Sequence, residues 1–311
     1  MRLVFLGTPA AAVPVLERCL ADGHEVAAVW TQPDRPAGRG NKLTPPPVKV
    51  CALAHGIPVH QPTKIKNAAA RELFASYRAD VAVVVAYGRI LPLSLLETPR
   101  YGCVNVHFSL LPEYRGAAPV NWAIVNGATQ TGITTMFMDE GLDTGPVLLQ
   151  EATPIGPDET APELLARLSI NGAELLSQTL RRLHELAPQT QDHTQASFAP
   201  ILTREDGLLD WSQTAQALVW RVRGLQPWPN AFTLFRGAKL ILWHATASDA
   251  TTDAASAGTI IAAKGDDLRV ACGDGTVLHI QELQPEGKRR QTARDFLNGI
   301  RAQVGEKLGS A

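Results

Sequence analysis

The sequence is poor in the features that mark secreted, metal-binding or membrane proteins. It holds only four cysteines, Cys19, Cys51, Cys103 and Cys272, and their spacing fits neither a zinc site nor a disulfide framework. No run of about 18 apolar residues predicts a membrane span, and the amino terminus MRLVFLGTPAAAVPVL lacks a signal-peptide pattern. We therefore expect a cytoplasmic protein that uses no metal and binds no membrane.

Neither sign of charge is in excess, because 29 Lys and Arg face 30 Asp and Glu. The net charge of −1 argues against a chain coated in positive charge, although local basic patches stay possible. An apolar fraction of 45% and a charged fraction of 19% are ordinary for a globular protein. At 311 residues the chain exceeds the usual domain of about 100–150 residues, so we expect two domains.

Short apolar segments alternate with helix-like segments through the first half of the chain. The predicted strands are residues 2–7, 25–31, 81–87, 102–108 and 132–138, and helical patterns at 12–20, 69–78 and 118–127 lie between several of them. Such alternation predicts an α/β fold with βα units and a mostly parallel sheet. A long amphipathic segment, residues 160–186, then closes a first domain that we place at residues 1–188.

The rest of the chain has a different character. Residues 189–207 are polar, Pro-containing and aperiodic, which predicts a linker. After a helical pattern at 213–225, residues 208–311 hold strand patterns joined by turns such as Gly-Asp-Gly, with no helix between them. This pattern predicts a second, smaller antiparallel β-barrel domain of the OB-like kind that often binds nucleic acid.

Polar residues gather where the predicted strands end. In NVHFSLLPEYRG, alternation sends Asn105, His107 and Ser109 to one face of a strand. The segment MDEGLDTGP delivers Asp143 on a glycine-flanked loop after a neighbouring strand. Ligands of open parallel sheets bind outside the carboxyl ends of the strands, so these side chains are candidates for a site.

Together, an amide, an imidazole and a carboxylate suit acyl transfer. The amide N–H of Asn105 and the imidazole of His107 can stabilise an oxyanion, and a carboxylate such as Asp143 favours the charged imidazole. Taken singly, each has a structural explanation: a strand-end His is often only hydrogen-bonded, Asn105 could cap a loop, and Asp143 could form a turn with Thr144. No GxGxxG, GxSxG or Walker pattern occurs, so the nucleophile is expected to come from the substrate.

At this point the motifs carry a resemblance to a known family. NVHFSLLPEYRGAAPVNWAIVNG followed by TGITTMFMDEGLDTGPVL resembles the formyltransferases that use 10-formyltetrahydrofolate. The segments TQPDRPAGRGNKLTPPPVK, VVVAYGRILP and DWSQTAQALVWRVRGLQPWP are similar to the members that act on initiator methionyl-tRNA. The resemblance covers nearly the whole chain and is weakest from Ala245 onward. It implies a Rossmann-like catalytic domain, a folate donor as co-substrate and initiator methionyl-tRNA as partner.

The resemblance also implies roles for individual residues. Asn105, His107 and Asp143 match the catalytic trio of the family. The folate site would be lined by Ser109, Leu110, Leu111 and Pro112, with a second wall formed by Tyr87, Gly88, Arg89, Ile90 and Leu91. Arg39 matches a basic residue associated with the acceptor end of the tRNA. The sequence departs from the family at Phe108, where a small residue is common, and at Ala10 and Ala11, which replace an acidic–aromatic pair.

Basic residues form two groups that suit an RNA backbone. The first lies on a long Pro- and Gly-rich loop and comprises Arg35, Arg39, Lys42 and Lys49, against the single acid Asp34. The second follows the last predicted strand and comprises Lys288, Arg289, Arg290 and Arg294. A solvated loop and an ordinary charged helix start are the alternative interpretations.

The predicted reaction is direct attack by the methionyl α-amine on the formyl carbon of 10-formyltetrahydrofolate, by a monomeric enzyme. Three rivals stay open at this point. They are a formyltransferase acting on an amino sugar or glycinamide ribonucleotide, a formyltetrahydrofolate hydrolase, and a catalytically silent tRNA-binding module.

Overall fold

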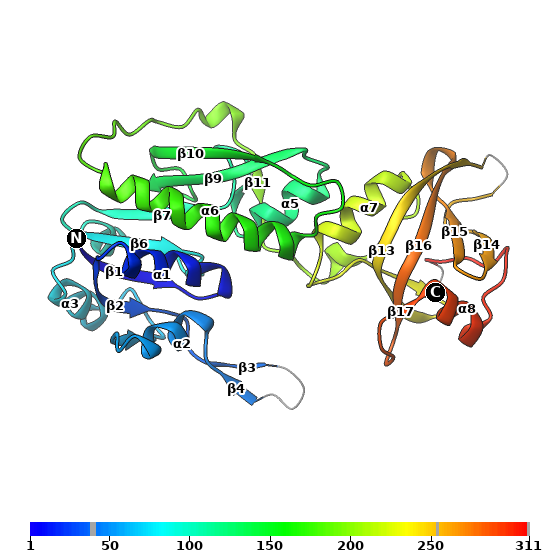
Figure 1. Cartoon of the computed structure of the whole chain (residues 1–311), viewed down its shortest axis with the longest axis horizontal. Coiled ribbons are helices and arrows are strands. Elements are labelled where there is room, and N and C mark those ends of the chain that lie inside the picture. The colour runs from blue at the N-terminus through cyan, green and yellow to red at the C-terminus, as the bar shows by residue number, and fades with distance from the viewer. Residues whose placement is uncertain (38–41, 253–254, 310–311) are drawn as a thin grey trace. The chain divides into compact units, whose positions relative to one another are not determined.

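The computed structural model describes residues 1–37, 42–252 and 255–309 of the chain. Its contacts divide the chain into two compact units. The N-terminal unit comprises Met1–Pro119, Gln130–Pro154 and Leu165–Pro200, and the C-terminal unit comprises Val120–Thr129, Ile155–Leu164 and Ile201–Ala311 (Figure 1). The domain boundaries at residues 188 and 208 stay predictions.

A seven-stranded sheet forms the centre of the N-terminal unit, in the order β10-β9-β7-β6-β1-β2-β5. Its strands are β1 (Arg2–Gly7), β2 (Glu25–Trp30), β5 (Val59–His60), β6 (Val81–Val85), β7 (Cys103–His107), β9 (Gln130–Phe137) and β10 (Val147–Pro154). The five strands from β5 to β7 run parallel, whereas β9 is antiparallel to β7 and to β10. The predicted mostly parallel, Rossmann-like sheet is therefore confirmed.

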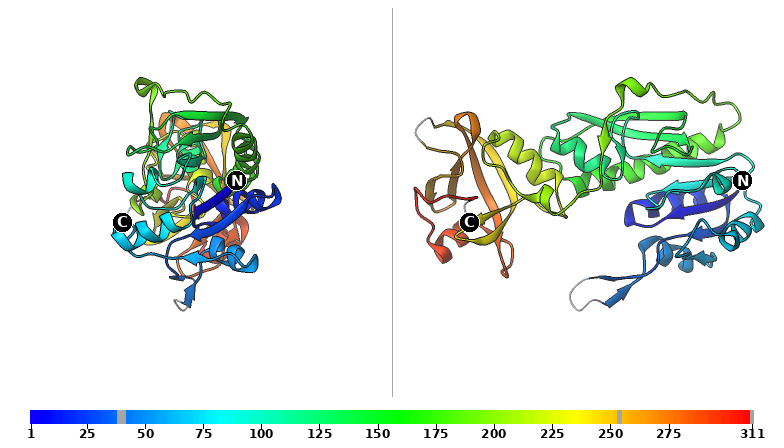
Figure 2. Two further views of the ribbon diagram at one scale, coloured as in Figure 1. Left: turned by 90° about the vertical axis from the view of Figure 1, so that its left-hand side faces the viewer. Right: turned by 180° about the vertical axis from the view of Figure 1, so that it is seen from behind.

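Helices cover both faces of this sheet (Figures 1 and 2). On one face lies α6 (Ala161–Arg181), where the hydroxyl of Thr179 is 2.8 Å from that of Thr135 on β9. Beside it, Arg18 of α1 (Val13–Ala21) pairs with Glu174 of α6 at 2.6 Å. On the other face, α3 (Ala68–Ser76) and α4 (Leu93–Leu96) contribute to a buried cluster with Val84.

Alternation along the strands explains the two faces. Val104 and Val106 of β7 are completely or almost completely buried, and a side chain at Gly172 of α6 would lie 3.0 Å from Val106. The ring of Phe108 would lie 3.4 Å from the same added side chain at Gly172. Phe108, where the sequence departs from the family pattern, is therefore used in core packing against α6. The remaining face of β7 is left for Asn105 and His107.

A two-stranded hairpin extends from the N-terminal unit (Figures 1 and 2). It consists of β3 (Arg35–Ala37) and β4 (Lys42–Thr44), with Arg35 opposite Thr44, and is followed by α2 (Pro47–Ala54). Arg39 lies outside the described residues.

Residues 189–200, which we call the strap segment, return to the N-terminal unit. The strap segment holds β11 (Phe198–Ala199), which pairs in parallel with β8 (Arg115–Gly116) directly after the Asn105–Pro112 region. Its first residue, Gln189, exchanges two backbone hydrogen bonds of 2.8 Å with Val147. The short helix α5 (Pro119–Val125) follows β8 in the sequence.

The C-terminal unit is built on an antiparallel sheet in the order β12-β13-β16-β15-β14, with β17 paired to β16. Its elements are α7 (Ala215–Gly224), β12 (Phe232–Phe235), β13 (Ala238–Thr251), β14 (Ile260–Lys264), β15 (Asp267–Ala271), β16 (Thr276–Pro285), β17 (Gln291–Thr292) and α8 (Ala293–Ile300). Near the carboxyl end of the chain, Leu308 bridges to Phe235 and Lys307 bridges to Thr259, which joins the two sides of the sheet. The predicted antiparallel β domain is thus confirmed.

Candidate active site

Strand β7 supplies the amide and the imidazole. Asn105 pairs with Val84 of β6 and Met136 of β9, so a central position in the sheet fixes its backbone. Asn105 and His107 lie two residues apart on one face, and their exposed fractions are only 7% and 6%. The sheet therefore holds both groups in a buried position at the carboxyl end of β7.

The imidazole of His107 lies between a carbonyl and a carboxylate. Its Nε2 is 3.0 Å from the carbonyl oxygen of Tyr114, and because a carbonyl only accepts, Nε2 carries a hydrogen. Its Nδ1 is 3.7 Å from Oδ2 of Asp143, an ion-pair separation that is longer than a hydrogen bond. The ring is thus held between an acceptor carbonyl on one side and the carboxylate of Asp143 on the other.

Close backbone packing shapes the loop that carries Asp143. A side chain at Gly141 would lie 1.9 Å from the hydroxyl of Thr144, and one at Gly145 would lie 1.9 Å from the carbonyl oxygen of Phe137. Asp143 itself has φ +52°, in the left-handed region that non-glycine residues rarely adopt. Its Oδ2 accepts a 2.8 Å hydrogen bond from the backbone N–H of Gly116. The predicted trio is thus brought together at one edge of the sheet.

Ser109 and Leu111, which follow β7, make hydrogen bonds that stabilise the turn after this strand. The fully buried hydroxyl of Ser109 donates a 2.6 Å bond to the carbonyl of Glu113. The backbone N–H of Leu111 donates to Oγ1 of Thr134, and Leu111 is buried together with Met136. Leu110 and Pro112 are partly exposed. The folate contacts assigned to Ser109, Leu110, Leu111 and Pro112 stay predictions.

The segment after β6 presents its side chains in different directions. Tyr87 is buried in the core cluster with its hydroxyl unpartnered among the described residues, and this burial raises the pKa of Tyr87 to about 12. Arg89 donates to Oε1 of Gln32 and to the carbonyl of Thr63. Ile90 is 71% exposed, Leu91 is buried and Gly88 is exposed with φ +80°. Their assignment to the folate wall stays a prediction.

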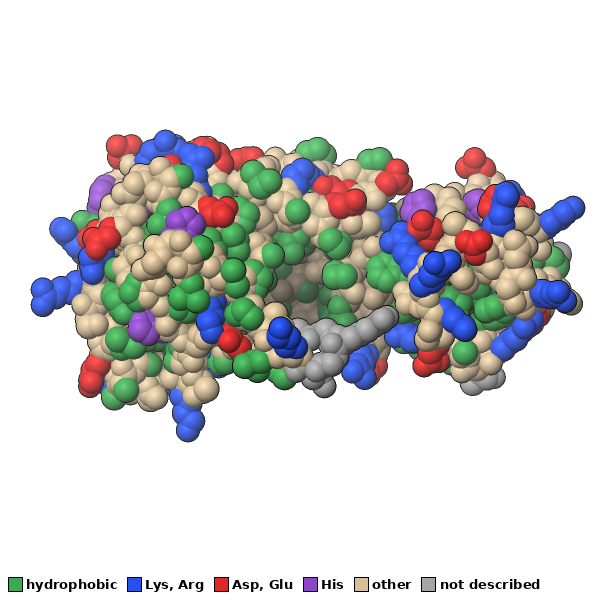
Figure 3. Space-filling view, turned by 60° about the horizontal axis from the view of Figure 1, so that its bottom comes forward, with side chains coloured by type: hydrophobic (Ala, Val, Ile, Leu, Met, Phe, Trp, Pro, Cys, Tyr) green, Lys and Arg blue, Asp and Glu red, His purple; other side chains and the backbone are tan. Residues whose placement is uncertain are grey.

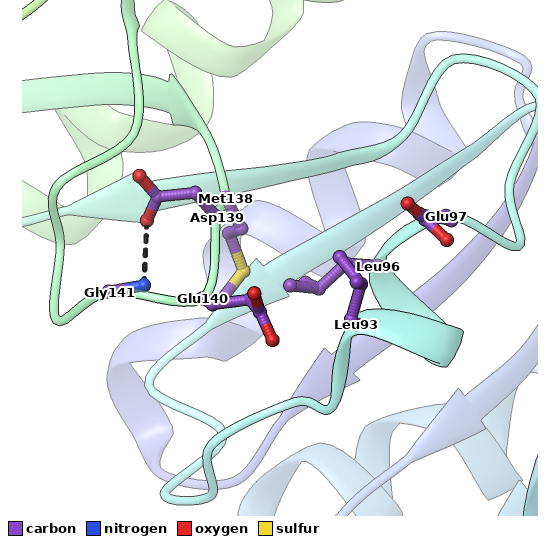
Figure 4. A pocket seen from close by; sticks show the side chains of 7 residues that line it. All are labelled: Leu93, Leu96, Glu97, Met138, Asp139, Glu140 and Gly141. Atoms are coloured by element: carbon purple, nitrogen blue, oxygen red, sulfur yellow. Dashed lines mark hydrogen bonds between the residues drawn. The ribbon is translucent and has the colours of Figure 1, made fainter.

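A pocket of about 460 Å³ opens beside the Asp143 loop. It is lined by Leu93, Leu96, Glu97, Met138, Asp139, Glu140 and Gly141. Figure 4 shows the side chains of Leu96 and Met138 pointing toward each other, with Asp139 accepting the N–H of Gly141 at 3.0 Å. The pocket combines apolar walls with carboxylates. The sequence analysis assigned none of these residues to the folate site, although Met138–Gly141 begin the MDEGLDTGP segment that carries Asp143.

The predicted RNA-binding residues of the first group are exposed where the structure describes them. Arg35 and Lys42 stand on β3 and β4 and are exposed. Lys49, by contrast, donates to Asp34 at 2.8 Å, and its hydrogen bond, with that of Gln61, lowers the pKa of Asp34. Arg35 and Lys42 on the hairpin are therefore accessible, whereas Lys49 on α2 is paired with Asp34.

The second basic group lies on the C-terminal unit. Lys288 and Arg289 are exposed, whereas Arg290 pairs with Glu282 and lies 5.1 Å from the ring centre of Trp243. Arg294 pairs with Asp266. Figure 3 shows Lys and Arg side chains on this unit with acidic side chains among them, a distribution that is mixed and not a continuous basic stripe.

Two further features concern metals and membranes. Within residues 1–37, 42–252 and 255–309, no group of three or more His, Cys, Asp or Glu is arranged to hold a metal ion. In the same described portion, none of the helices has the length and apolar character needed to cross a bilayer.

Both units of the chain have counterparts among known proteins. Residues 1–180 match the formyl transferase family, and residues 201–301 match the formyl transferase C-terminal domain. The chain therefore belongs to the formyltransferase family.

The relatives specify the enzyme class further. The chain is 50% identical over 314 residues to the methionyl-tRNA formyltransferase of Geobacter metallireducens, covering 99% of both chains. It is 50% identical to that of Solibacter usitatus, again covering 99% of each, and 47% identical to that of Geobacter sulfurreducens, covering 100% and 98%. This confirms the prediction of a methionyl-tRNA formyltransferase, and the other formyltransferases and the hydrolase are not favoured.

Solved structures share the fold at low identity. WlaRD, a sugar 3N-formyltransferase, superposes with a TM-score of 0.68 at 15% identity, covering 93% of this chain and 99% of that one. The N-formyltransferase from Helicobacter canadensis gives 0.67 at 18% identity, covering 90% and 98%. HypX from Aquifex aeolicus superposes with a TM-score of 0.65 at 16% identity. The superposition covers 99% of this chain and 50% of the HypX chain.

Proposed function

We propose that the protein transfers the formyl group of 10-formyltetrahydrofolate to the α-amine of methionine on charged initiator tRNA. The observation that carries the proposal is the buried Asn105–His107 pair on β7, with Asp143 3.7 Å from the imidazole and a pocket beside it. The full-length methionyl-tRNA formyltransferase relatives support the acceptor. As a translation enzyme, the protein is also proposed to act in the cytoplasm, and as a monomer.

The reaction is proposed to need no covalent enzyme intermediate. The amine nitrogen attacks the formyl carbon, a new C–N bond forms, and the carbonyl oxygen becomes an oxyanion. Asn105 and the protonated His107 stabilise this oxyanion. Collapse breaks the bond to N10, and the proton lost by the amine passes to N10, a transfer that the His107–Asp143 pair assists.

The folate donor is proposed to occupy the pocket lined by Leu93, Leu96 and Met138. A pterin is flat and apolar on its faces, which fits these side chains, and its N–H groups need acceptors, which Asp139 and Glu140 provide. Among the structural neighbours, WlaRD was solved with 5-N-formyl-tetrahydrofolate and HypX with tetrahydrofolic acid. The pocket residues Met138–Gly141 adjoin Asp143 in sequence, so a donor whose pterin occupies the pocket would have its N10-formyl group near the trio.

The proposed function is tested with purified protein, charged initiator tRNA and a donor labelled in the formyl group. We expect the label on the methionine of the tRNA. Release of labelled formate at the same rate without tRNA would instead indicate a hydrolase. No transfer and no release would refute the proposal.

The tRNA contacts are proposed to include Arg35, Arg39, Lys42, Lys288 and Arg289, with a smaller contribution from Arg290 because Glu282 neutralises it. Arg39→Ala should weaken use of charged tRNA, spare donor affinity, and flatten the log–log salt dependence by roughly 0.7–0.9. Neutralising Lys288 and Arg289 is the matched comparison for the second group. Unchanged tRNA kinetics and salt slope in both variants would remove these residues from the interface.

A further inference from the structure

The strap segment places one buried amide against the loop that carries Asp143. Gln191 is only 5% exposed. Its Nε2 donates to the carbonyl oxygens of Asp143 at 2.9 Å and Gly145 at 2.8 Å, so both backbone acceptors around the catalytic carboxylate are satisfied by a single side chain. No motif recognised in the sequence accounts for this glutamine.

The other end of the Gln191 side chain fixes its orientation. Its Oε1 accepts two hydrogen bonds from the guanidinium of Arg115, at 3.1 Å from Nε and 2.6 Å from Nη2. A guanidinium only donates, so the oxygen must face Arg115 and the nitrogen must face the Asp143 loop. The side-chain amide of Gln191 accepts two hydrogen bonds from Arg115 and donates two to the Asp143 loop, so its orientation is fixed.

Arg115 connects this amide to the rest of the site. Its side chain is 3% exposed, and its hydrogen-bond partners are the neutral Gln191 and Nδ1 of His193. The next residue, Gly116, donates its N–H to the carboxylate of Asp143. Asp143 is thus held twice, at its carboxylate by β8 and at its carbonyl by Gln191.

Two restraints matter because the backbone of Asp143 is strained. A non-glycine residue at φ +52° occupies a sparsely populated backbone conformation and persists only where its surroundings determine it. The 3.7 Å separation from His107 depends on that conformation. A loop free to relax would move the carboxylate away from the imidazole.

We propose that Gln191 is a positioning residue for formyl transfer, holding Asp143 against His107 through its bonds to the Asp143 loop and Arg115. The inference rests on the proposed function. Its consequence is that the polar strap segment, which lies within the N-terminal unit, contributes to the catalytic machinery, although none of its side chains needs to touch the substrate.

The test is Gln191→Glu. The glutamate retains the acceptors for Arg115 and gains an ion pair, but it turns a carboxylate oxygen toward the carbonyls of Asp143 and Gly145. We expect kcat to fall by about 10- to 100-fold, since small displacements of catalytic groups carry penalties of that order. The KM for the folate donor and the melting temperature should stay close to wild type. Gln189→Glu, an exposed position of the same segment, is the control and should leave all three unchanged.

A double-mutant comparison separates positioning from general stability. If Gln191 acts through Asp143, Gln191→Glu should change kcat by less than about threefold when Asp143 is already Asn. An equal loss in both backgrounds would overturn the proposal. Should Gln191→Glu fail to fold, Arg115→Lys, which loses the guanidinium fork but keeps the charge, serves in its place with the same expected pattern.

A third readout does not depend on the proposed function. Amide hydrogen exchange of residues 139–145 should be faster in Gln191→Glu than in Gln189→Glu. Equal exchange in the two variants would refute the positioning role even in a protein that transfers no formyl group. Faster exchange with no transfer by the wild type would instead refute the proposed function alone.

Discussion

Gly116 gives a quantitative test of how β8 holds the site. Its φ of +123° is a conformation that side chains rarely adopt, and a Cβ there would lie 2.6 Å from the carbonyl oxygen of Ala199. That oxygen accepts hydrogen bonds from Ala117 and Ala118, at 2.9 and 3.2 Å. Gly116→Ala must therefore move the strap segment, the β8 backbone or both.

The expected cost follows from these contacts. Backbone strain of about 1–3 kcal/mol and two weakened hydrogen bonds of about 0.5–1.5 kcal/mol each together give about 2–6 kcal/mol. Since each kcal/mol of lost stability lowers the melting temperature by about 2–4 °C, the melting temperature of the N-terminal unit should fall by roughly 10 °C. The shifted N–H of Gly116 also weakens its bond to Asp143, a bond to a charged group contributing about 1.5–3 kcal/mol. This predicts a kcat lower by roughly 10- to 100-fold.

Thermal unfolding and single-turnover transfer measure the two effects. The control is Gly56→Ala, another left-handed glycine of the N-terminal unit, at φ +68° with no atom within 4 Å of the added Cβ. That variant should lose only about 1–2 kcal/mol and no activity. If Gly116→Ala has the same melting temperature as Gly56→Ala and transfers the formyl group at the wild-type rate, β8 does not hold the site in the way proposed.

Three further predictions concern the trio and the pocket. Asn105→Ala should lower turnover by about 10²–10³-fold with donor affinity retained, and near-normal single-turnover transfer would exclude it as an oxyanion donor. Asp143→Asn removes the charge at nearly constant shape, so kcat should fall while the melting temperature changes little; an unchanged kcat would contradict its role. Leu93→Asp should raise the KM for the folate donor by about tenfold or more, measured beside Leu73→Asp, which is similarly exposed on α3 but outside the pocket. Equal KM values in these two variants would place the donor elsewhere.

The central strands were predictable because their apolar runs have no competing interpretation. Val81–Val85 is buried at every position, as an uninterrupted apolar strand should be. Strand β10 was not predicted, since Val147–Pro154 mixes buried and exposed positions without strict alternation. The antiparallel direction of β9 also follows from pairing across the sheet, which local periodicity does not encode.

The site was predictable only as far as the strand pattern extends. Alternation predicted that Asn105 and His107 share one face of the strand. Because β7 ends at His107, the alternation does not extend to Ser109, whose hydroxyl closes the following turn. Ala86 has φ +45°, which breaks the pattern after β6, and the ring of Tyr87 enters the core. The Leu93–Met138 pocket depends on two segments meeting in space.

The pairing of β8 with β11 sets a limit on how the polypeptide can be shortened or recombined. A chain cut at residue 188 would retain Asn105, His107 and Asp143 but would lose the backbone partners of Arg115, Ala117 and Ala118. Fragments or chimaeras that exchange the second domain should therefore keep the native sequence through Pro200, where the N-terminal unit ends. The same constraint applies if relatives acquire a new acceptor by exchanging the second domain. The junction between the exchanged sequences should then lie after β11.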